Sequence, residues 1–231
     1  MKEKAVFNWS GGKDSILALY KTLHKNKYDV ISLLTTINKK YDRISMHGVR
    51  SELLDLQVES LGIPLQKVLL PEMADMATYT SIMGNVTAGL QKKGITVFLF
   101  GDLFLEDIRA YRETQLSGSG IRSEFPIWQY DTRRAAHDFI NLGFKAILTS
   151  VDASKLDETF AGRLYDEKLL SDLPENVDPC GENGEFHTFV FDGPLFSQPI
   201  KITHGKTVYR TYRLQDKAVS SGFYYTDLIP R

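Results

Sequence analysis

The residues best suited to chemistry form a short loop at positions 10–15, with the sequence Ser-Gly-Gly-Lys-Asp-Ser. An apolar strand, Ala5–Trp9, precedes the loop, and apolar residues recur at helical spacing from Ile16 to Leu23 behind it. The loop therefore leads into a helix N-terminus. Free backbone N–H groups and the positive end of the helix dipole make such a point a binding site for anions. We expect the loop to bind phosphate.

The residue types within the loop fit this chemistry. Gly11 and Gly12 lack the Cβ atoms that would keep phosphate oxygens away from the backbone. Ser10 and Ser15 offer hydroxyl donors, and Lys13 offers a mobile positive charge. A tight Gly-Gly turn with a serine cap is the structural alternative.

Asp14 adds a second element to the prediction. A carboxylate beside phosphates is repelled unless a cation intervenes, so Asp14 predicts a Mg²⁺ ion bridging to a nucleotide. Two better-known nucleotide loops do not match. The spacing of a Walker A loop is absent, and the glycines of 118–120 do not complete Gly-x-Gly-x-x-Gly because position 123 is serine.

The elements that must position the loop alternate along the chain. Apolar runs predict strands at Val30–Thr36, Leu65–Leu70 and Ile95–Phe100. Helical spacing predicts helices over about 54–61, 76–90 and 105–116. This alternation predicts an α/β fold with a doubly wound parallel sheet. Ligands sit at the carboxyl ends of such strands, and the residues that fall there are Ser10, Thr35, Thr36, Gly101 and Asp102.

The second half of the chain differs in character. A Gly/Ser-rich stretch at 117–123 is a candidate hinge or lid, and a helix at 132–142 and a strand at 145–151 follow. Beyond Pro174 the segments 186–191, 200–203 and 207–212 are β-rich. We expect a first domain at 1–127 and a smaller mixed α/β domain at 128–231. The Tyr/Arg alternation of 206–213 favours an edge strand over a nucleic-acid platform.

Charged residues cluster behind the strand that ends at Gly101. Asp102 should emerge at the ligand edge of the sheet. Glu106, Arg109 and Glu113 follow at a spacing that places them on one face of a helix. We predict that this row binds substrate, and surface salt bridging is the alternative.

A second cluster lies at 178–189. Two glycines and an asparagine loosen the backbone there, while Glu182, Glu185 and His187 crowd one loop. These side chains could bind an ammonium-like nucleophile, act as a general base or hold Mg²⁺. A tight β-turn with solvated acids is the alternative.

These motifs resemble two known groups. The loop at 10–15 resembles the PP-loop of ATP pyrophosphatases, and the run 180–196 resembles the Glu-Gly-Gly-Glu-(Phe/Tyr)-x-Thr signature of the diphthine–ammonia ligase family. With Gly101–Glu113 between them, the resemblance covers essentially the whole chain. It implies a sheet of the adenine nucleotide alpha hydrolase (HUP) type. It also implies that ATP, with Mg²⁺, is split to AMP and pyrophosphate as ammonia joins an adenylated carboxylate.

The resemblance also implies roles for individual residues. Catalytic roles fall to Lys13, Asp14, Glu185 and His187, with Asp14 as the metal ligand. Nucleotide binding falls to Ser10, Gly11, Gly12, Lys13, Asp14, Ser15, Thr35, Thr36, His47 and Gly101. Acceptor binding falls to Asp102, Glu106, Arg109, Glu113, Glu182 and Glu185.

The chain departs from the family pattern in places. Asn183 replaces a glycine of the signature, Asp102 replaces a small residue, and 107–109 replaces a Tyr-Gln-x-x-Arg-like run. These features resemble a bacterial-type branch and leave the acceptor open. Diphthine is one candidate, and another carboxylate, such as a corrinoid salvage intermediate, is a second. The acceptor could belong to a protein or to a small molecule.

Composition narrows the functional classes. The 231 residues carry 28 basic and 29 acidic side chains. The resulting net charge of −1 argues against non-specific electrostatic binding of nucleic acid. The longest apolar stretches, such as Ile95–Phe100, are too short to cross a bilayer. The N-terminus runs through Met-Lys-Glu-Lys into the first strand, which leaves no room for a signal peptide. We therefore expect a cytoplasmic protein.

The single cysteine, Cys180, excludes an intramolecular disulfide and any Cys-x-x-Cys site. This favours nitrogen transfer over the sulfur transfer of related enzymes that thiolate tRNA. A nucleotide sensor without turnover and a tRNA-modifying enzyme are the competing classes. The oligomeric state, including a homo-oligomer, is left open.

Overall fold

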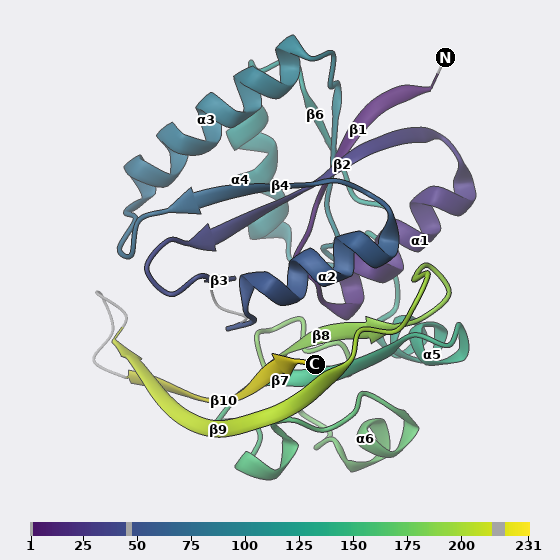
Figure 1. Cartoon of the computed structure of the whole chain (residues 1–231), viewed down its shortest axis with the longest axis vertical. Coiled ribbons are helices and arrows are strands. Elements are labelled where there is room, and N and C mark those ends of the chain that lie inside the picture. Colours follow the sequence, from purple (N-terminus) through teal and green to yellow (C-terminus); the bar gives the residue numbers. More distant parts are fainter. Residues whose placement is uncertain (1, 45–47, 214–219) are drawn as a thin grey trace.

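The computed structural model describes residues 2–44, 48–213 and 220–231, and it contains two β-sheets (Figure 1). Five strands of the first sheet lie side by side in the order β4-β2-β1-β5-β6, and each neighbouring pair of them is parallel. Its strands are β1 (Glu3–Asn8), β2 (Tyr28–Asn38), β4 (Leu65–Leu70), β5 (Val97–Leu99) and β6 (Arg122–Glu124). A two-residue strand, β3 (Arg43–Ile44), adds an antiparallel pair at the end of β2. The predicted parallel sheet is confirmed.

Helices cover both faces of this sheet (Figure 1). They are α1 (Lys13–Lys25), α2 (Ser51–Leu61), α3 (Met76–Lys92) and α4 (Glu106–Leu116). Alternate side chains of β1 enter different cores, because successive strand residues point to opposite faces. Phe7 packs into the core that contains residues of α1 and α2, whereas Val6 packs with residues of α3 and α4. The fold is thus doubly wound.

The chain direction across the sheet reverses between β1 and β5. From β1 the chain proceeds outward through β2 and β4, and it then returns to β5 and β6 on the other side. Ligands bind at the carboxyl ends of strands flanking such a switch point. Ser10 and Gly101 follow directly after these two strand ends.

The second sheet is antiparallel, in the order β8-β7-β10-β9. Its strands are β7 (Lys145–Asp152), β8 (Phe186–Asp192), β9 (Ile202–Arg213) and β10 (Ser220–Pro230). The helices α5 (Thr132–Asn141) and α6 (Glu167–Asp172) and the 3₁₀ turn η1 (Glu158–Phe160) complete this smaller mixed unit. The domain boundary at residue 128 stays a prediction.

Three details of the predicted elements were wrong or missed. The segments 200–203 and 207–212 belong to one continuous strand, β9, which begins only at Ile202. Part of the expected hinge at 117–123 belongs to β6, whose sequence Arg-Ser-Glu carries no apolar signal. β10 was not predicted. No helix among the described residues is long and apolar enough to cross a membrane.

Candidate active site

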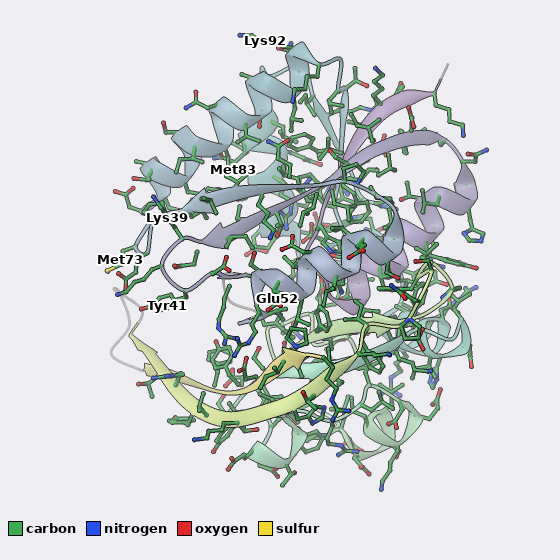
Figure 2. The ribbon with its side chains drawn as sticks, viewed as in Figure 1. Lys39, Tyr41, Glu52, Met73, Met83 and Lys92 are labelled. Atoms are coloured by element: carbon green, nitrogen blue, oxygen red, sulfur yellow. The ribbon has the colours of Figure 1, made fainter. Side chains whose placement is uncertain are left out.

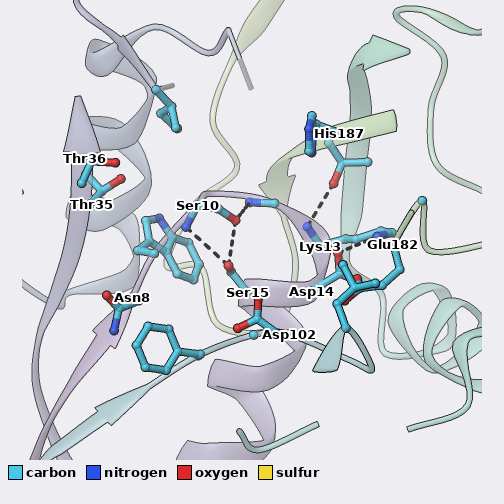
Figure 3. A pocket seen from close by; sticks show the side chains of 18 of the residues that line it. Asn8, Ser10, Lys13, Asp14, Ser15, Thr35, Thr36, Asp102, Glu182 and His187 are labelled. Atoms are coloured by element: carbon cyan, nitrogen blue, oxygen red, sulfur yellow. Dashed lines mark hydrogen bonds and ion pairs between the residues drawn. The ribbon is translucent and has the colours of Figure 1, made fainter. Parts of the chain in front are cut away.

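A cavity of about 340 Å³ lies at the carboxyl ends of β1, β2 and β5, where the two sheets approach one another (Figure 3). We name its two main walls the phosphate loop (residues 10–15) and the acidic loop (residues 178–185). The predicted site residues that line it are Ser10, Gly12, Lys13, Asp14, Ser15, Thr35, Thr36, Gly101, Asp102, Glu182 and His187. Segments far apart in the sequence are therefore brought together.

The phosphate loop presents hydroxyl and amide donors to the cavity. The Ser10 and Ser15 hydroxyls lie 2.7 Å apart, and the Gly12 N–H donates to Ser10 Oγ at 3.3 Å (Figure 3). Ile16 N–H is bonded to the Gly12 carbonyl, so the amides of the preceding first turn have no acceptor within the helix. These amides include that of Asp14 and make the loop a suitable anion cradle.

The phosphate loop is held in place from outside. Gln57, fully buried on α2, donates to the carbonyls of Gly11 and Val190 at 2.9 and 2.6 Å and accepts from the Trp9 indole at 3.0 Å. Val190 N–H also donates to the Gly11 carbonyl at 3.0 Å. A Cβ at Gly12 would lie 3.1 Å from the Thr188 carbonyl oxygen. The second sheet therefore braces the loop.

Lys13 is the charged centre of the cavity. Only 3 % of it is exposed, and its Nζ lies 2.6 Å from Asp14 Oδ2 and contacts the Cys180 carbonyl. The rings of Tyr165 and Phe186 lie 5.7 and 5.5 Å away. Burial by itself lowers the pKa of Lys13, but the charge and hydrogen bond of Asp14 together with the nearby Cys180 and Glu182 outweigh it, and the pKa is raised. Lys13 is therefore a protonated, desolvated cation.

Asp14 shares this environment. Burial raises the pKa of Asp14, and the attraction to Lys13 opposes that rise. No cluster of three metal-ligating side chains occurs in the described ranges. Mg²⁺ bound together with nucleotide phosphates requires only one or two carboxylates. The donor set around Asp14 is compatible with such an ion.

The two glutamates of the acidic loop have different surroundings. Glu182 lines the cavity, and its Oε1 accepts from the Leu103 N–H at 2.9 Å. Burial and the nearby charge of Asp14 raise the pKa of Glu182 to about 7. A carboxylate that changes charge near neutral pH is suited to general acid–base chemistry.

Glu185 is instead turned into its own loop. It is 2 % exposed and accepts from the amides of Asp178 and Asn183 at 3.1 and 2.9 Å. The Asn183 side-chain amide donates to it as well, at 3.1 Å. Glu185 is not among the residues that line the cavity. Its position therefore fits a structural role in the loop, while the predicted catalytic role stays a prediction.

His187 lines the cavity from β8. Burial and the positive charge of Lys13 lower the pKa of His187 to about 4. The imidazole is therefore neutral near pH 7. In that state it can accept or donate a hydrogen bond without adding charge.

Gly101 and Asp102 form the floor of the cavity beside β5. A Cβ at Gly101 would lie 3.1 Å from the backbone nitrogen of Ser15, so the close approach of these two segments favours glycine. Asp102 accepts from Arg112 Nη2 at 3.0 Å, and the Arg112 guanidinium lies 4.4 Å from the centre of the Phe100 ring. Arg112 also lines the cavity and was not predicted.

The predicted row on α4 lies elsewhere. Glu106 and Glu113 are exposed, and Arg109 pairs with Glu113 at 2.8 Å. The Arg109 guanidinium lies 4.8 Å from the ring of Trp128. None of the three row residues lines the cavity. The structure does not bring this row together with the phosphate loop, and its substrate-binding role stays a prediction.

Other predicted and missed residues complete the inventory. Gly11 supports the loop through its carbonyl, while His47 lies outside the described residues. Asn8, Tyr79 and Met83 line the cavity although sequence reasoning missed them. Tyr79 and Met83 lie on α3 and are half-buried beside the cavity.

Comparison with known proteins identifies two adjoining family matches. The diphthamide synthase N-terminal domain matches residues 1–123. The diphthamide synthase C-terminal domain matches residues 131–219. The two matches together include both cavity walls.

Sequence relatives in three organisms are named diphthine–ammonia ligases. A diphthine–ammonia ligase of Danio rerio is 24% identical over 223 residues, covering 86% of each chain, and that of Homo sapiens is 22% identical over 221 residues, covering 86% of this chain and 82% of its own. The Schizosaccharomyces pombe ligase is 33% identical over 93 residues, which span 38% of this chain and only 15% of that protein. A solved Methanocaldococcus jannaschii structure, described as a predicted subunit of tRNA methyltransferase, aligns with TM-score 0.43 and 18% identity over 81% of this chain and 96% of its own.

Proposed function

This chain belongs to the diphthamide synthase family, and we propose that it is an ATP-dependent ligase of diphthamide synthesis that joins ammonia to an adenylated carboxylate. The names of its relatives support this reaction, with diphthine as the acceptor. They favour diphthine over a corrinoid intermediate. The observation that carries the proposal is the meeting of an anion cradle with a buried lysine and a glutamate of raised pKa in one cavity.

In the first step, an oxygen of the acceptor carboxylate attacks the α-phosphorus of ATP. The bond between the α-phosphorus and the bridging oxygen breaks, and pyrophosphate leaves with that electron pair. The phosphate loop would hold the polyphosphate through its amides and through Ser10 and Ser15. Lys13 would offset the charge that develops on the leaving group.

A Mg²⁺ ion held by Asp14 and the phosphates would add further charge neutralisation during this step. Thr35 and Thr36, at the end of β2, would lie beside the adenosine. Gly101 would let the backbone of α1 approach closely enough to form the cradle.

In the second step, ammonia attacks the acyl carbon of the adenylate. A C–N bond forms, the C–O bond to the phosphate breaks, and AMP leaves. The new nitrogen then loses a proton, and Glu182 is the residue placed to accept it because its pKa is near 7 and it faces the cavity. Neutral His187 would orient the nucleophile without repelling it.

The fate of α-labelled ATP tests this proposal. Purified protein is incubated with Mg²⁺, ammonium and a diphthine-bearing acceptor, and the nucleotide products are separated. We expect AMP in amounts equal to the amide formed, and none when acceptor is omitted. ADP as the product, or ATP that binds tightly but is never cleaved, would contradict the proposal, and the second result would favour a nucleotide sensor.

A further inference from the structure

A second cavity, of about 840 Å³, lies outside the site described above. Its wall on one side is the long curved ribbon of β9 and β10, which passes below β3 and α2 in Figure 1. Its other wall is formed by the ends of β2 and β3 and by Glu72 and Met73. Ile44 lines both cavities, so the second cavity adjoins the first.

The two carboxylates that line this cavity both have partners of opposite charge. Asp227 is fully occupied, because Arg43 donates to it at 3.0 Å and Arg50 at 2.6 and 3.0 Å. Glu72 is likewise paired, with Lys40 at 2.5 Å and with the Tyr41 hydroxyl at 2.8 Å. The acidic residues that line the cavity are therefore already neutralised by neighbours.

Two cations on β9 have no such partner. Lys206 and Arg210 are exposed, and neither pairs with a carboxylate of the part of the chain that the structure describes. Val208 lies midway between them, and the three side chains share one face of the strand because each is two residues from the next. Val208 is 38 % exposed and so offers apolar surface between the two charges.

The rim of the cavity is apolar. Met73 is 83 % exposed and Tyr41 is 57 % exposed. Figure 2 shows both side chains projecting on the same side of the molecule, above the ribbon. Within the described residues β9 pairs only with β10, so its outer edge is open to another strand. Such an edge can pair with an extended polypeptide segment.

We infer that this second cavity binds an extended acidic segment of the acceptor protein, with acidic side chains four residues apart on Lys206 and Arg210 and an apolar side chain between them on Val208. Alternate residues of an extended chain project every ~6.6 Å, which matches the spacing along β9. The inference rests on the proposed function, in that the acceptor carboxylate belongs to a protein. The shared residue Ile44 places the neighbouring part of that protein beside the first cavity.

A polypeptide fits these observations better than a nucleic acid does. A nucleic acid offers phosphates but no extended polypeptide backbone that could pair with the open edge of β9. The chain as a whole carries a net charge of −1 and so offers no general attraction to a polyanion. An acidic peptide with an apolar centre satisfies both the two cations and the exposed Val208.

A charge-swap binding experiment tests the inference. The probe is a fluorescein-labelled peptide with two glutamates four positions apart and a leucine midway, and binding to the full chain is followed by anisotropy. Lys206→Glu combined with Arg210→Glu should weaken binding at least about tenfold. The same peptide with lysines in place of glutamates should bind this variant better than it binds the wild type.

The matched control is Arg133→Glu combined with Lys168→Glu, which makes the same charge change at two exposed positions of the same domain. Peptide binding to this control should stay within twofold of wild type. Equal binding of the peptide to all three proteins would overturn the inference. So would binding of tRNA that is lost in the β9 variant and that displaces the peptide.

A parallel measurement separates this inference from the proposed function. Both charge variants should bind ATP as the wild type does, because the altered residues lie outside the first cavity. Failure of the wild type to bind ATP would contradict the proposed function. The charge-swap experiment would still show whether Lys206 and Arg210 bind an acidic peptide. Unchanged melting temperatures would establish that the variants are folded.

Discussion

The phosphate loop and the acidic loop face each other across one cavity but are stabilised in opposite ways. The phosphate loop is held from outside, by Gln57 and by β8, whose Thr188 hydroxyl accepts from the Lys13 N–H at 3.1 Å. The acidic loop is held from inside, by the carboxylates of Asp178 and Glu185. Acidic side chains in a motif can therefore serve the loop itself, and only Glu182 of the two glutamates lines the cavity.

The largest expected effect is at the phosphate loop. Lys13→Ala should lower the rate of AMP formation by about 10³-fold, because the charge on departing pyrophosphate would lose its buried partner. Product analysis with α-labelled ATP measures this, and circular dichroism checks the fold. Lys25→Ala, at the exposed end of α1, is the matched control. Equal turnover in the two variants would mean that Lys13 has no part in the reaction.

Next comes the glutamate that faces the cavity. Glu182→Gln should lower amide formation by about 10²-fold, since it removes a proton acceptor. Its Oε1 would still accept from Leu103, so the fold should be retained. In the wild type, activity should rise as the pH increases through about 7, and the variant should lose this rise. A pH–rate profile that is the same in both proteins would exclude Glu182 as the base.

The raised pKa of Glu182 also makes the stability of the fold depend on pH. Because the pKa of Glu182 is raised in the folded state, the folded protein holds more protons there than the unfolded chain between about pH 4.5 and 7. This group's contribution therefore weakens the fold as the pH rises through that window. The difference in melting temperature, Glu182→Gln minus wild type, should grow with pH; a difference that shrinks would reverse the assignment.

The inward-facing glutamate should behave differently. Glu185→Gln should cost about 1–3 kcal/mol of unfolding free energy, because one buried acceptor becomes a donor facing the loop amides. Denaturant titration measures this change. Activity should fall only in proportion to the loss of folded loop. A Glu185→Gln variant that is stable but inactive would contradict the structural role and support the catalytic role predicted from the sequence.

The smallest effect is expected on α4, where two arginines three residues apart can be compared. Arg112→Ala should raise the KM for the acceptor by about tenfold, because Asp102 loses a charge-assisted partner inside the cavity. Arg109→Ala should change it less than about fivefold, since its ion pair with Glu113 is exposed. A larger increase in KM for Arg109→Ala than for Arg112→Ala would support the predicted substrate site at Glu106, Arg109 and Glu113.

Much of this architecture could be predicted from the sequence because its signals are local. The glycines of the phosphate loop, the strand before it and the helix after it are contiguous, so their pattern is sufficient. β6 was missed because it is three polar residues paired to a buried strand. Its existence depends on the neighbouring β5 rather than on its own composition.

The remaining site residues depend on contacts between distant segments. Gln57 is one polar residue in an amphipathic helix, and its three partners, Trp9, Gly11 and Val190, come from two segments far apart in the sequence. Arg112 and Arg109 look alike in sequence, and the turn of α4 alone decides which of them enters the cavity. The spacing rule correctly placed Glu106, Arg109 and Glu113 on one helix face but could not tell which face the fold turns inward.

The central claim, that the acceptor carboxylate is activated as an adenylate, is tested most directly with oxygen isotopes. A diphthine-bearing acceptor is labelled with ¹⁸O in its carboxylate and incubated with ATP, Mg²⁺ and ammonium, and the phosphorus products are examined by mass spectrometry. The account predicts one ¹⁸O atom in the phosphate of AMP, because the attacking oxygen stays with phosphorus when the amide forms. Label in inorganic phosphate, or amide formation without label in AMP, would contradict it.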